Sequence, residues 1–240
     1  MAKSSSADRS KTGNRVLDAL SPEALALLRP HLETFPLVLG QAIQEPGEKA
    51  EYVYFPTGGM ISIVAAMADG AAVEIGMAGK EGMFGISIIL GDDTPAQKAM
   101  VQLPGSALRM RSTQLRRAAQ ASPELHGLLL RYAQTVLTAA TQSAACNRLH
   151  SLEQRCARWL LAARDRAEGD TFPITHEFLA MMLGVRRPGV TIAVQNFRDG
   201  GMITYNHGTM AVLDRVGLEA ASCECYRFIQ DESKRLLGGE

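Results

Sequence analysis

The sequence predicts an α+β protein built in three parts: a small barrel or sandwich of strands, one long helix, and a carboxy-terminal unit of two helices and a hairpin. Between residues 35 and 110, short apolar runs alternate with Gly, Pro and Asp. From Pro123 to about His150, apolar residues recur at steps of three and four. The stretch LAMMLGVRRPGVTIAVQNF, residues 179–197, then shows two helical segments that meet at a glycine.

Composition sets only broad limits on function. The chain has 240 residues, enough for one large domain or two small ones, and 46% of them are hydrophobic. Lys and Arg together number 25, as do Asp and Glu, so no overall basic charge indicates nucleic acid. A local basic face is still sufficient for binding a short duplex site. No run of about 18 apolar residues and no signal peptide is found, which predicts a cytoplasmic protein without a membrane partner.

The amino-terminal half is predicted to hold a disordered leader and a strand-rich domain. Residues 1–15 are polar and predict the leader, and residues 16–112 predict the domain. Residues 16–32 have helical spacing, with Ser21 as a cap and Pro22 in the first turn. Asp69-Gly70 and Pro104-Gly105 predict turns between strands. The alternating apolar positions are Ile61, Ile63 and Ala65 before the first turn, and Val73, Ile75 and Met77 after it.

Residues 113–150 are predicted to form a central helix. Its apolar stripe has two interpretations: packing on the strand domain of the same chain, or dimerisation with a second copy. We favour dimerisation, because one face of a small barrel cannot cover so long a stripe, and small residues in the second half permit close approach. The predicted dimer-interface residues are Leu125, Leu129, Tyr132, Val136, Ala140 and Ala144.

Residues 151–240 predict a winged helix-turn-helix. A helix over 152–165 precedes a second one that Thr175 caps and Gly184 ends. A third helix begins near Arg187, where Pro188 is tolerated because first-turn N–H groups lack acceptors within the helix. Asp199-Gly200-Gly201 ends it, and Asn206-His207-Gly208 predicts the turn of a hairpin.

The third helix is predicted to have two faces. One would pack on the preceding helix and contains Val190, Ala193, Val194 and Phe197. The other contains Arg187, Thr191 and Gln195, which are spaced four residues apart. The pair Arg186-Arg187 has a simpler interpretation as an exposed charged turn.

From Ile174 to Ile203, the pattern IT, LA, LG, R, VT, F and DGGMI resembles the Crp/Fnr family of bacterial transcription regulators. The resemblance extends over almost everything after the leader. It implies a β-roll related to cyclic-nucleotide-binding domains, a dimer-forming central helix, and a recognition helix in the major groove of DNA.

The resemblance also implies roles for individual residues. Arg187 matches the family's base-reading arginine, and Thr191 and Gln195 share its face. Thr175, His176 and Arg186 stand where phosphate oxygens would lie. Pro188 stands at a position that is often a base-reading glutamate, so the family's operator does not carry over.

The cyclic-nucleotide site of the family is predicted to be degenerate here. Met83 stands at the position of the ribose-binding glutamate and Gln97 near that of the phosphate-binding arginine. Lys98 would point to the opposite face of a strand. A buried phosphate without a fixed cation is poorly compensated, so we expect no cyclic nucleotide and no cofactor.

The cysteines, Cys146, Cys156, Cys223 and Cys225, match no zinc or disulfide framework. We interpret Cys223-x-Cys225 as ordinary helix surface and core, with a redox or metal role as the alternative. The amino-terminal cysteines of the family's iron–sulfur members are missing. Enzyme motifs fail as well, since His176-Glu177 lacks the second histidine of a zincin.

The predicted function is a homodimeric, sequence-specific DNA-binding transcription regulator, not an enzyme. Its predicted partners are double-stranded DNA and a second copy of itself, with RNA polymerase as a further candidate. One alternative is a small-molecule sensor whose barrel binds an unrecognised ligand to control DNA binding. Another is an interaction module whose helix-turn-helix docks a protein.

Overall fold

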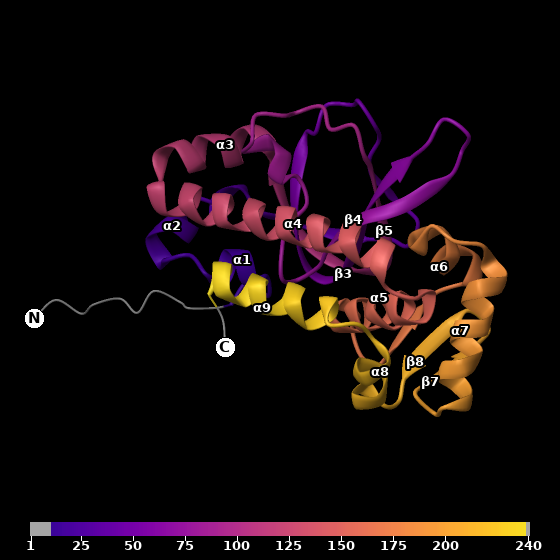
Figure 1. Cartoon of the computed structure of the whole chain (residues 1–240). Coiled ribbons are helices and arrows are strands. Elements are labelled where there is room, and N and C mark those ends of the chain that lie inside the picture. Colours follow the sequence, from indigo (N-terminus) through magenta and orange to yellow (C-terminus); the bar gives the residue numbers. More distant parts are fainter. Residues whose placement is uncertain (1–10, 239–240) are drawn as a thin grey trace, which may run out of the picture.

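The computed structural model describes residues 11–238, and Figure 1 shows them as an upper β-roll joined to a terminal helical unit by a long helix. Within this range, the roll's antiparallel sheet has the order β1-β5-β3-β4, and β2 also pairs with β5. The strands are β1 (Glu33–Leu37), β2 (Ala42–Gln44), β3 (Tyr52–Ala66), β4 (Ala72–Ala78) and β5 (Lys98–Arg111). The predicted α+β class is confirmed.

One predicted turn of the roll is confirmed and one is wrong. Asp69-Gly70 lies in the hairpin between β3 and β4, where Met67 N donates to Ala71 O. Pro104-Gly105 lies inside β5, which continues to Arg111. The register between β3 and β5 shifts on either side of Gly58, and a Cβ on Gly105 would lie 2.4 Å from the Gly58 carbonyl oxygen. Glycine is therefore needed at position 105 because two strands come close together there. In the sequence, the same Pro-Gly pair is typical of a turn.

Short helices close the lower end of the roll. The segment 16–32 forms α1 (Arg15–Asp18), α2 (Pro22–Ala26) and η1 (Arg29–His31), with Ser21 capping α2 as predicted. Asn14 is fully buried and donates to the carbonyls of Pro56 and Gly82, each at 2.8 Å. The folded chain therefore starts before residue 16, and residues 1–10 of the predicted leader lie outside the described residues.

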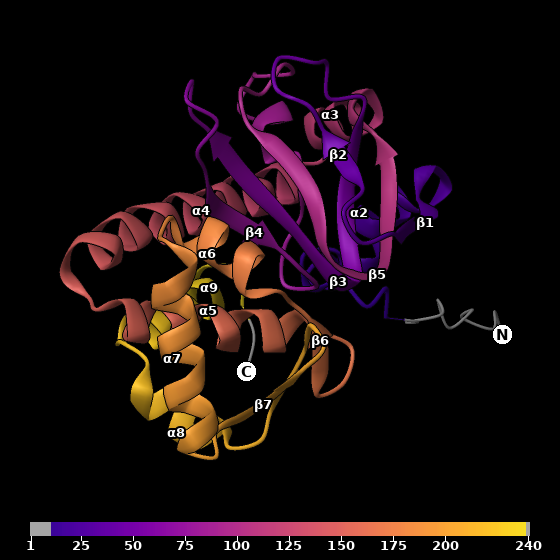
Figure 2. The ribbon, with the colours of Figure 1, turned by 90° about the vertical axis from the view of Figure 1, so that its right-hand side faces the viewer.

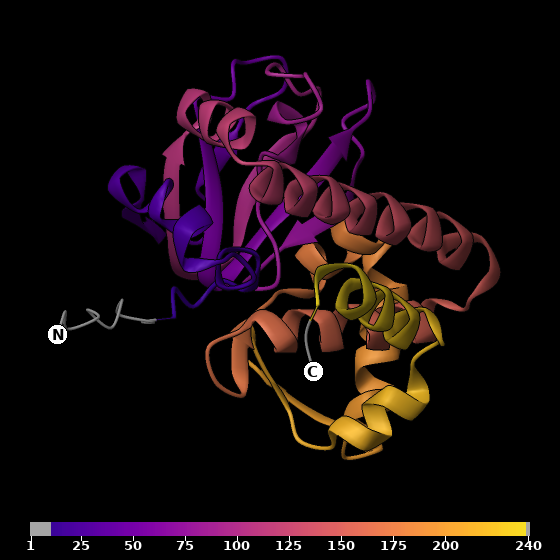
Figure 3. The same cartoon turned by 90° about the vertical axis from the view of Figure 1, so that its left-hand side faces the viewer.

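The central helix is long, as predicted. After η2 (Ile86–Ile88) and α3 (Ser112–Ala121), α4 runs from Pro123 to Leu149. One side of α4 packs on the roll, and α9 (Cys225–Leu237) packs along another side, as Figure 3 shows. Among the described residues, no helix has the length and hydropathy that crossing a membrane requires.

The terminal unit is a winged helix-turn-helix, as predicted. It contains α5 (Leu152–Arg166), β6 (Thr171–Pro173), α6 (His176–Leu183), α7 (Arg187–Asp199), β7 (Ile203–Asn206), β8 (Thr209–Val212) and α8 (Arg215–Ala221). A small sheet has the order β6-β8-β7. His207 and Gly208 both have positive φ in the β7–β8 turn, which matches the twist of a two-residue hairpin. Figure 2 shows α6, α7 and this hairpin below the roll.

Candidate nucleic-acid interface

The turn between α6 and α7 is fixed by local features of the sequence. The Thr175 hydroxyl oxygen accepts from Phe178 N at 3.1 Å and so caps α6. Gly184 ends α6 with φ of +63°, a left-handed conformation that costs glycine little. Pro188 lies in the first turn of α7, and Arg186 precedes it with extended backbone. These features place both arginines at the exposed amino-terminal end of α7.

The two predicted faces of α7 are confirmed. Val190, Ala193, Val194 and Phe197 are buried in a core shared with α5 and α6. Arg187, Thr191 and Gln195 are exposed on the other side. Because the buried face anchors the helix, the exposed face is held as a fixed row of polar groups open to solvent.

A hollow of about 590 Å³ adjoins the start of this row. It lies between the amino-terminal ends of α6 and α7 and the wing. Its lining residues are Thr175, His176, Glu177, Arg187, Tyr205, His207 and Gly208. The hollow therefore brings together residues from both helices and from the hairpin.

The arginines of the turn are available to an anionic ligand. Arg187 Nη1 lies 3.7 Å from Glu177 Oε2, and the two side chains are 65% and 79% exposed. An ion pair this exposed contributes little and yields readily to a stronger partner. The side chain of Arg186 is exposed and has no ion-pair partner within residues 11–238.

His176 supports Thr191 rather than facing solvent. Its Nδ1 lies 3.0 Å from Thr191 Oγ1, and its ring stacks on Tyr205 with centroids 4.5 Å apart. Nε2 is buried without a hydrogen-bond partner among the described residues. Burial lowers the pKa of His176, and the positive charges of Arg187 and Arg198 lower it further. Nε2 is enclosed and Nδ1 faces Thr191, so His176 orients Thr191 in this structure, and its phosphate contact stays a prediction.

Gln195 already has partners on its own helix. Its Nε2 donates to Asp199 Oδ1 at 2.6 Å, and its Oε1 accepts from Arg198 Nη1 at 3.4 Å. Binding a base edge would exchange these exposed hydrogen bonds for new ones. Arg187 is thus the residue of the row that loses least on contact with DNA.

The predicted dimer stripe on α4 is wrong in its first half. Leu125 and Leu129 are at most 1% exposed and Tyr132 is 6% exposed, because all three pack into the roll of their own chain. Tyr132 also donates to Met83 O at 2.7 Å. Val136 is partly buried against the same core, whereas Ala140 and Ala144 are exposed.

A different stripe of α4 is open. Leu130 is 44% exposed and Leu137 is 57% exposed, on the side that neither the roll nor α9 covers. These leucines are spaced seven apart, in line with Ala140 and Ala144. The sequence contains this second stripe, but periodicity alone did not show which of the two stripes packs on the roll.

Met83 and Gln97, which the resemblance places at the nucleotide position, differ in their surroundings. Met83 is 2% exposed and belongs to the core beneath α4. Gln97 is exposed, and Lys98 Nζ lies 3.0 Å from Glu45 Oε1. A separate hollow of about 340 Å³ is lined by Glu45, Glu48 and Glu51 together with Lys49, and its excess of carboxylates disfavours a phosphate.

Two family models match the chain. A cyclic nucleotide-binding domain model matches residues 36–122, and a Crp-like helix-turn-helix domain model matches residues 154–221. The chain belongs to the Crp/Fnr family of transcriptional regulators. No protein with a curated description matches it in sequence.

Solved structures of Crp/Fnr proteins share this fold. FixK2 from Bradyrhizobium japonicum is 17% identical, with a TM-score of 0.68 over 80% of this chain and 98% of that one. A Crp/Fnr regulator from Thermus thermophilus is 22% identical, with a TM-score of 0.64 over 79% and 98%. The c-di-GMP responsive regulator CLP from Xanthomonas campestris is 16% identical, with a TM-score of 0.64 over 80% and 99%.

Sequence reasoning missed one further grouping in this Crp/Fnr protein. Cys146 and His150, on the last turns of α4, lie beside Cys223 and Cys225. The available signal was Cys-x₃-His at the end of a helix, a spacing that puts both side chains on one face. It was missed because 77 residues separate Cys146 from Cys223.

Proposed function

We propose that this Crp/Fnr protein is a homodimeric, sequence-specific transcription regulator whose α7 enters the major groove of DNA. The exposed row of Arg187, Thr191 and Gln195 carries the proposal. An arginine at the amino-terminal end of such a helix can donate two hydrogen bonds to O6 and N7 of guanine.

Arg186 and Thr175 are proposed to contact phosphates on either side of this row. Both are exposed, and phosphate contacts fix register and affinity without reading sequence. His176 takes the role of positioning residue, since its ring holds the Thr191 hydroxyl. The wing residue His207 lines the hollow between α6, α7 and the wing, and from there it can approach the sugar-phosphate backbone of DNA.

The dimer is proposed to form through the open stripe of Leu130, Leu137, Ala140 and Ala144. Burying the exposed side chains of the two leucines against a second copy is favourable, and the alanines allow a second helix to approach closely. Pairing two copies would present two α7 helices to half-sites about one helical turn apart. A dimer on a promoter, in the cytoplasm, acts by contacting RNA polymerase or by excluding it.

The roll is proposed to bind no cyclic nucleotide. A bound cyclic phosphate would need a fixed cation, but Gln97 is neutral and Lys98 is paired with Glu45. The roll then serves as the scaffold that supports α4.

Selection of bound sequences from a random duplex pool tests the proposed function. We expect enrichment of a two-fold symmetric site whose half-sites each contain a guanine. Retention of the pool at low salt without any enriched sequence would contradict base reading, and failure to retain DNA at all would favour a protein-docking module.

A further inference from the structure

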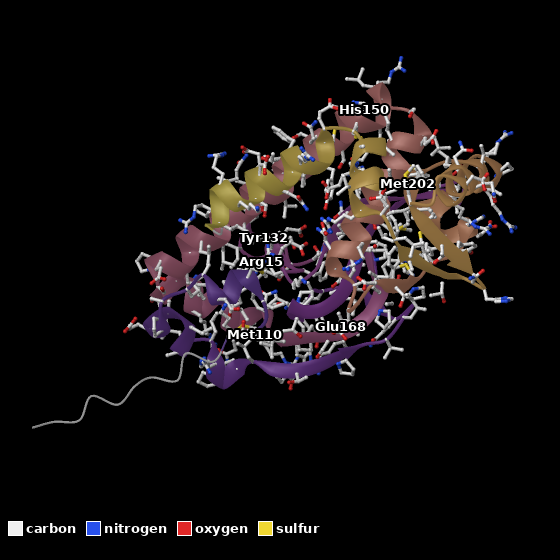
Figure 4. The ribbon with its side chains drawn as sticks, turned by 90° about the horizontal axis from the view of Figure 1, so that it is seen from below. Arg15, Met110, Tyr132, His150, Glu168 and Met202 are labelled. Carbon is white, nitrogen blue, oxygen red and sulfur yellow. The ribbon has the colours of Figure 1, made fainter. Side chains whose placement is uncertain are left out.

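Three cysteines and one histidine meet at the carboxyl end of α4. The ligand atoms of Cys146, His150, Cys223 and Cys225 all lie within 4.8 Å of one another. Cys146 Sγ is 3.5 Å from Cys223 Sγ, and Cys225 Sγ is 3.6 Å from His150 Nδ1. Figure 4 shows His150 at the end of α4, next to the start of α9.

The fold builds this cluster from two local pieces. Cys146 lies on the last turn of α4, and His150 caps the end of that helix, where its N–H donates to Cys146 O at 3.1 Å. Cys223 and Cys225 flank Glu224 where α8 gives way to α9. The packing of α9 along α4 brings the two pieces together.

The cluster is enclosed. Cys146, Cys223 and Cys225 are at most 4% exposed and form a small buried group of their own. The side chain of His150 is 17% exposed. The positively charged side chain of Arg158 lies near Cys146. The Nε of Arg158 is buried without a hydrogen-bond partner among the described residues.

The four ligand atoms are grouped closely enough for one tetrahedral ion. With Zn–S of about 2.3 Å and Zn–N of about 2.0 Å, a tetrahedron has S–S edges of about 3.8 Å and S–N edges of about 3.5 Å. Two of the six separations, 3.5 Å and 3.6 Å, lie close to these values, and the others are at most 4.8 Å, so the ligand atoms need to draw together by about 1 Å at most. An iron–sulfur cluster spreads its four protein ligands over two or four irons, so the ligands do not all converge on one point.

The surrounding groups orient the ligands. His150 Nε2 lies 3.2 Å from Glu224 Oε1, which leaves Nδ1 facing the sulfurs. A carboxylate on the far nitrogen of a metal-binding histidine fixes its tautomer and orientation. Gln142 Nε2 donates to Cys225 Sγ at 3.1 Å, the kind of bond a thiolate accepts.

We propose that Cys146, His150, Cys223 and Cys225 bind one divalent zinc-class ion. Binding replaces three thiol protons, which are released to solvent, and leaves a site with net charge of minus one beside Arg158. All four tetrahedral positions are filled by protein, which is the pattern of a structural site.

The ion would tie the end of α4 to the start of α9. Because α9 follows the winged unit in the chain, the ion would hold that unit against the proposed dimer helix. This consequence rests on the proposed function, whereas the metal site does not.

Cobalt(II) titration of the reduced, tag-free full-length chain tests the site without DNA. We expect one ion per chain, with thiolate-to-cobalt charge-transfer bands and the intense visible bands of tetrahedral coordination, both displaced by zinc. Mass analysis of the aerated chain detects the alternative, a Cys146–Cys223 disulfide. Weak octahedral spectra, a stoichiometry well below one with reduced thiols, or a disulfide that forms even with zinc bound would overturn the proposal.

Matched variants assign the ligands. Cys223→Ser and Cys146→Ser should each lower cobalt affinity at least 100-fold and abolish the zinc-induced rise in melting temperature. Cys156→Ser alters an equally buried cysteine on α5. This variant should keep both the cobalt affinity and the zinc-induced rise in melting temperature. Glu224→Gln should weaken binding about 10- to 100-fold without removing the charge-transfer bands. Equal loss in Cys156→Ser, or full affinity in Cys223→Ser, contradicts the assignment.

DNA binding is then measured separately, with zinc and after chelation. If chelation lowers the DNA affinity and zinc restores it, the ion does hold the winged unit against α4; we call this role of the ion the clamp. Unchanged affinity would exclude the clamp while leaving the spectroscopic site intact, and absence of DNA binding in both states would bear on the proposed function alone.

Discussion

The exposed face of α7 and the interior of the β-roll differ in how they treat charge. On α7, Arg187 is 65% exposed and weakly paired, in a row of polar groups held by a buried face. In the roll, Met83 is 2% exposed, and Lys98 near the nucleotide position is paired with Glu45. One end of this Crp/Fnr protein presents a row of polar groups to solvent, and the other buries an apolar side chain at Met83.

The comparison teaches that fold and ligand separate readily. The roll keeps its strands because they support α4, and apolar side chains such as Met83 serve that purpose well. The α7 row contributes nothing to the core, so its polar side chains need an external partner to explain them. Each prediction below breaks or sharpens this contrast.

The largest expected effect comes from the helix that joins the two regions. Leu130→Glu with Leu137→Glu should give a monomer of 25.9 kDa, because two charges would enter the proposed interface. DNA affinity should fall about 10²- to 10⁴-fold, since each half-site is then held alone. Light scattering and DNA titration measure both.

Leu39→Glu is the control for this change, since Leu39 is 52% exposed in the turn between β1 and β2. It should remain a dimer with full affinity. A double variant that stays dimeric would place the interface elsewhere.

The boundary between the regions should respond to pH through Glu74 on β4. Its carboxylate accepts from Trp159 Nε1 on α5 at 2.8 Å and from the Ser62 hydroxyl at 2.5 Å. Burial raises the pKa of Glu74 to about 7 from 4.5, despite these hydrogen bonds. The folded state thus holds this proton more tightly than the unfolded chain, and the stability it confers is lost as pH rises through 7.

Glu74→Gln should therefore raise the free energy of unfolding at pH 8, by at most about 3 kcal/mol, with a smaller gain toward pH 5. Urea denaturation at several pH values measures it. Glu48→Gln, at an exposed position, should change nothing. A gain that is independent of pH would mean that Glu74 is ionised throughout.

The two arginines of the turn should differ in the kind of loss they cause. Arg187→Ala should cost about 1–3 kcal/mol on the best site and relax preference at one base pair of each half-site. Arg186→Ala should weaken all sequences alike and make the logarithmic salt slope shallower by about one unit for each phosphate interaction removed. Titration against single-base operator variants at several salt concentrations separates them. Uniform loss in both would make Arg187 a phosphate anchor and leave base reading to Thr191 or Gln195.

Sequence predicted best where the determinants are local. Thr175, Gly184 and Pro188 fix the helix-turn-helix within a few residues, and α7 has one apolar face only. On α4 the same reasoning chose Leu125 over Leu130, because both stripes are apolar and only the tertiary fold shows which one meets the roll. Pro104-Gly105 and the cysteine–histidine cluster likewise depend on neighbours distant in sequence.

The central claim is that DNA reading persists without nucleotide sensing. The most direct test is a titration of the best selected DNA site with and without millimolar cyclic AMP or cyclic GMP, alongside calorimetry of each nucleotide with the protein. We predict unchanged DNA affinity, unchanged melting temperature and no saturable heat. Micromolar nucleotide binding that raises DNA affinity would contradict the claim and would mean that another cation accepts the phosphate.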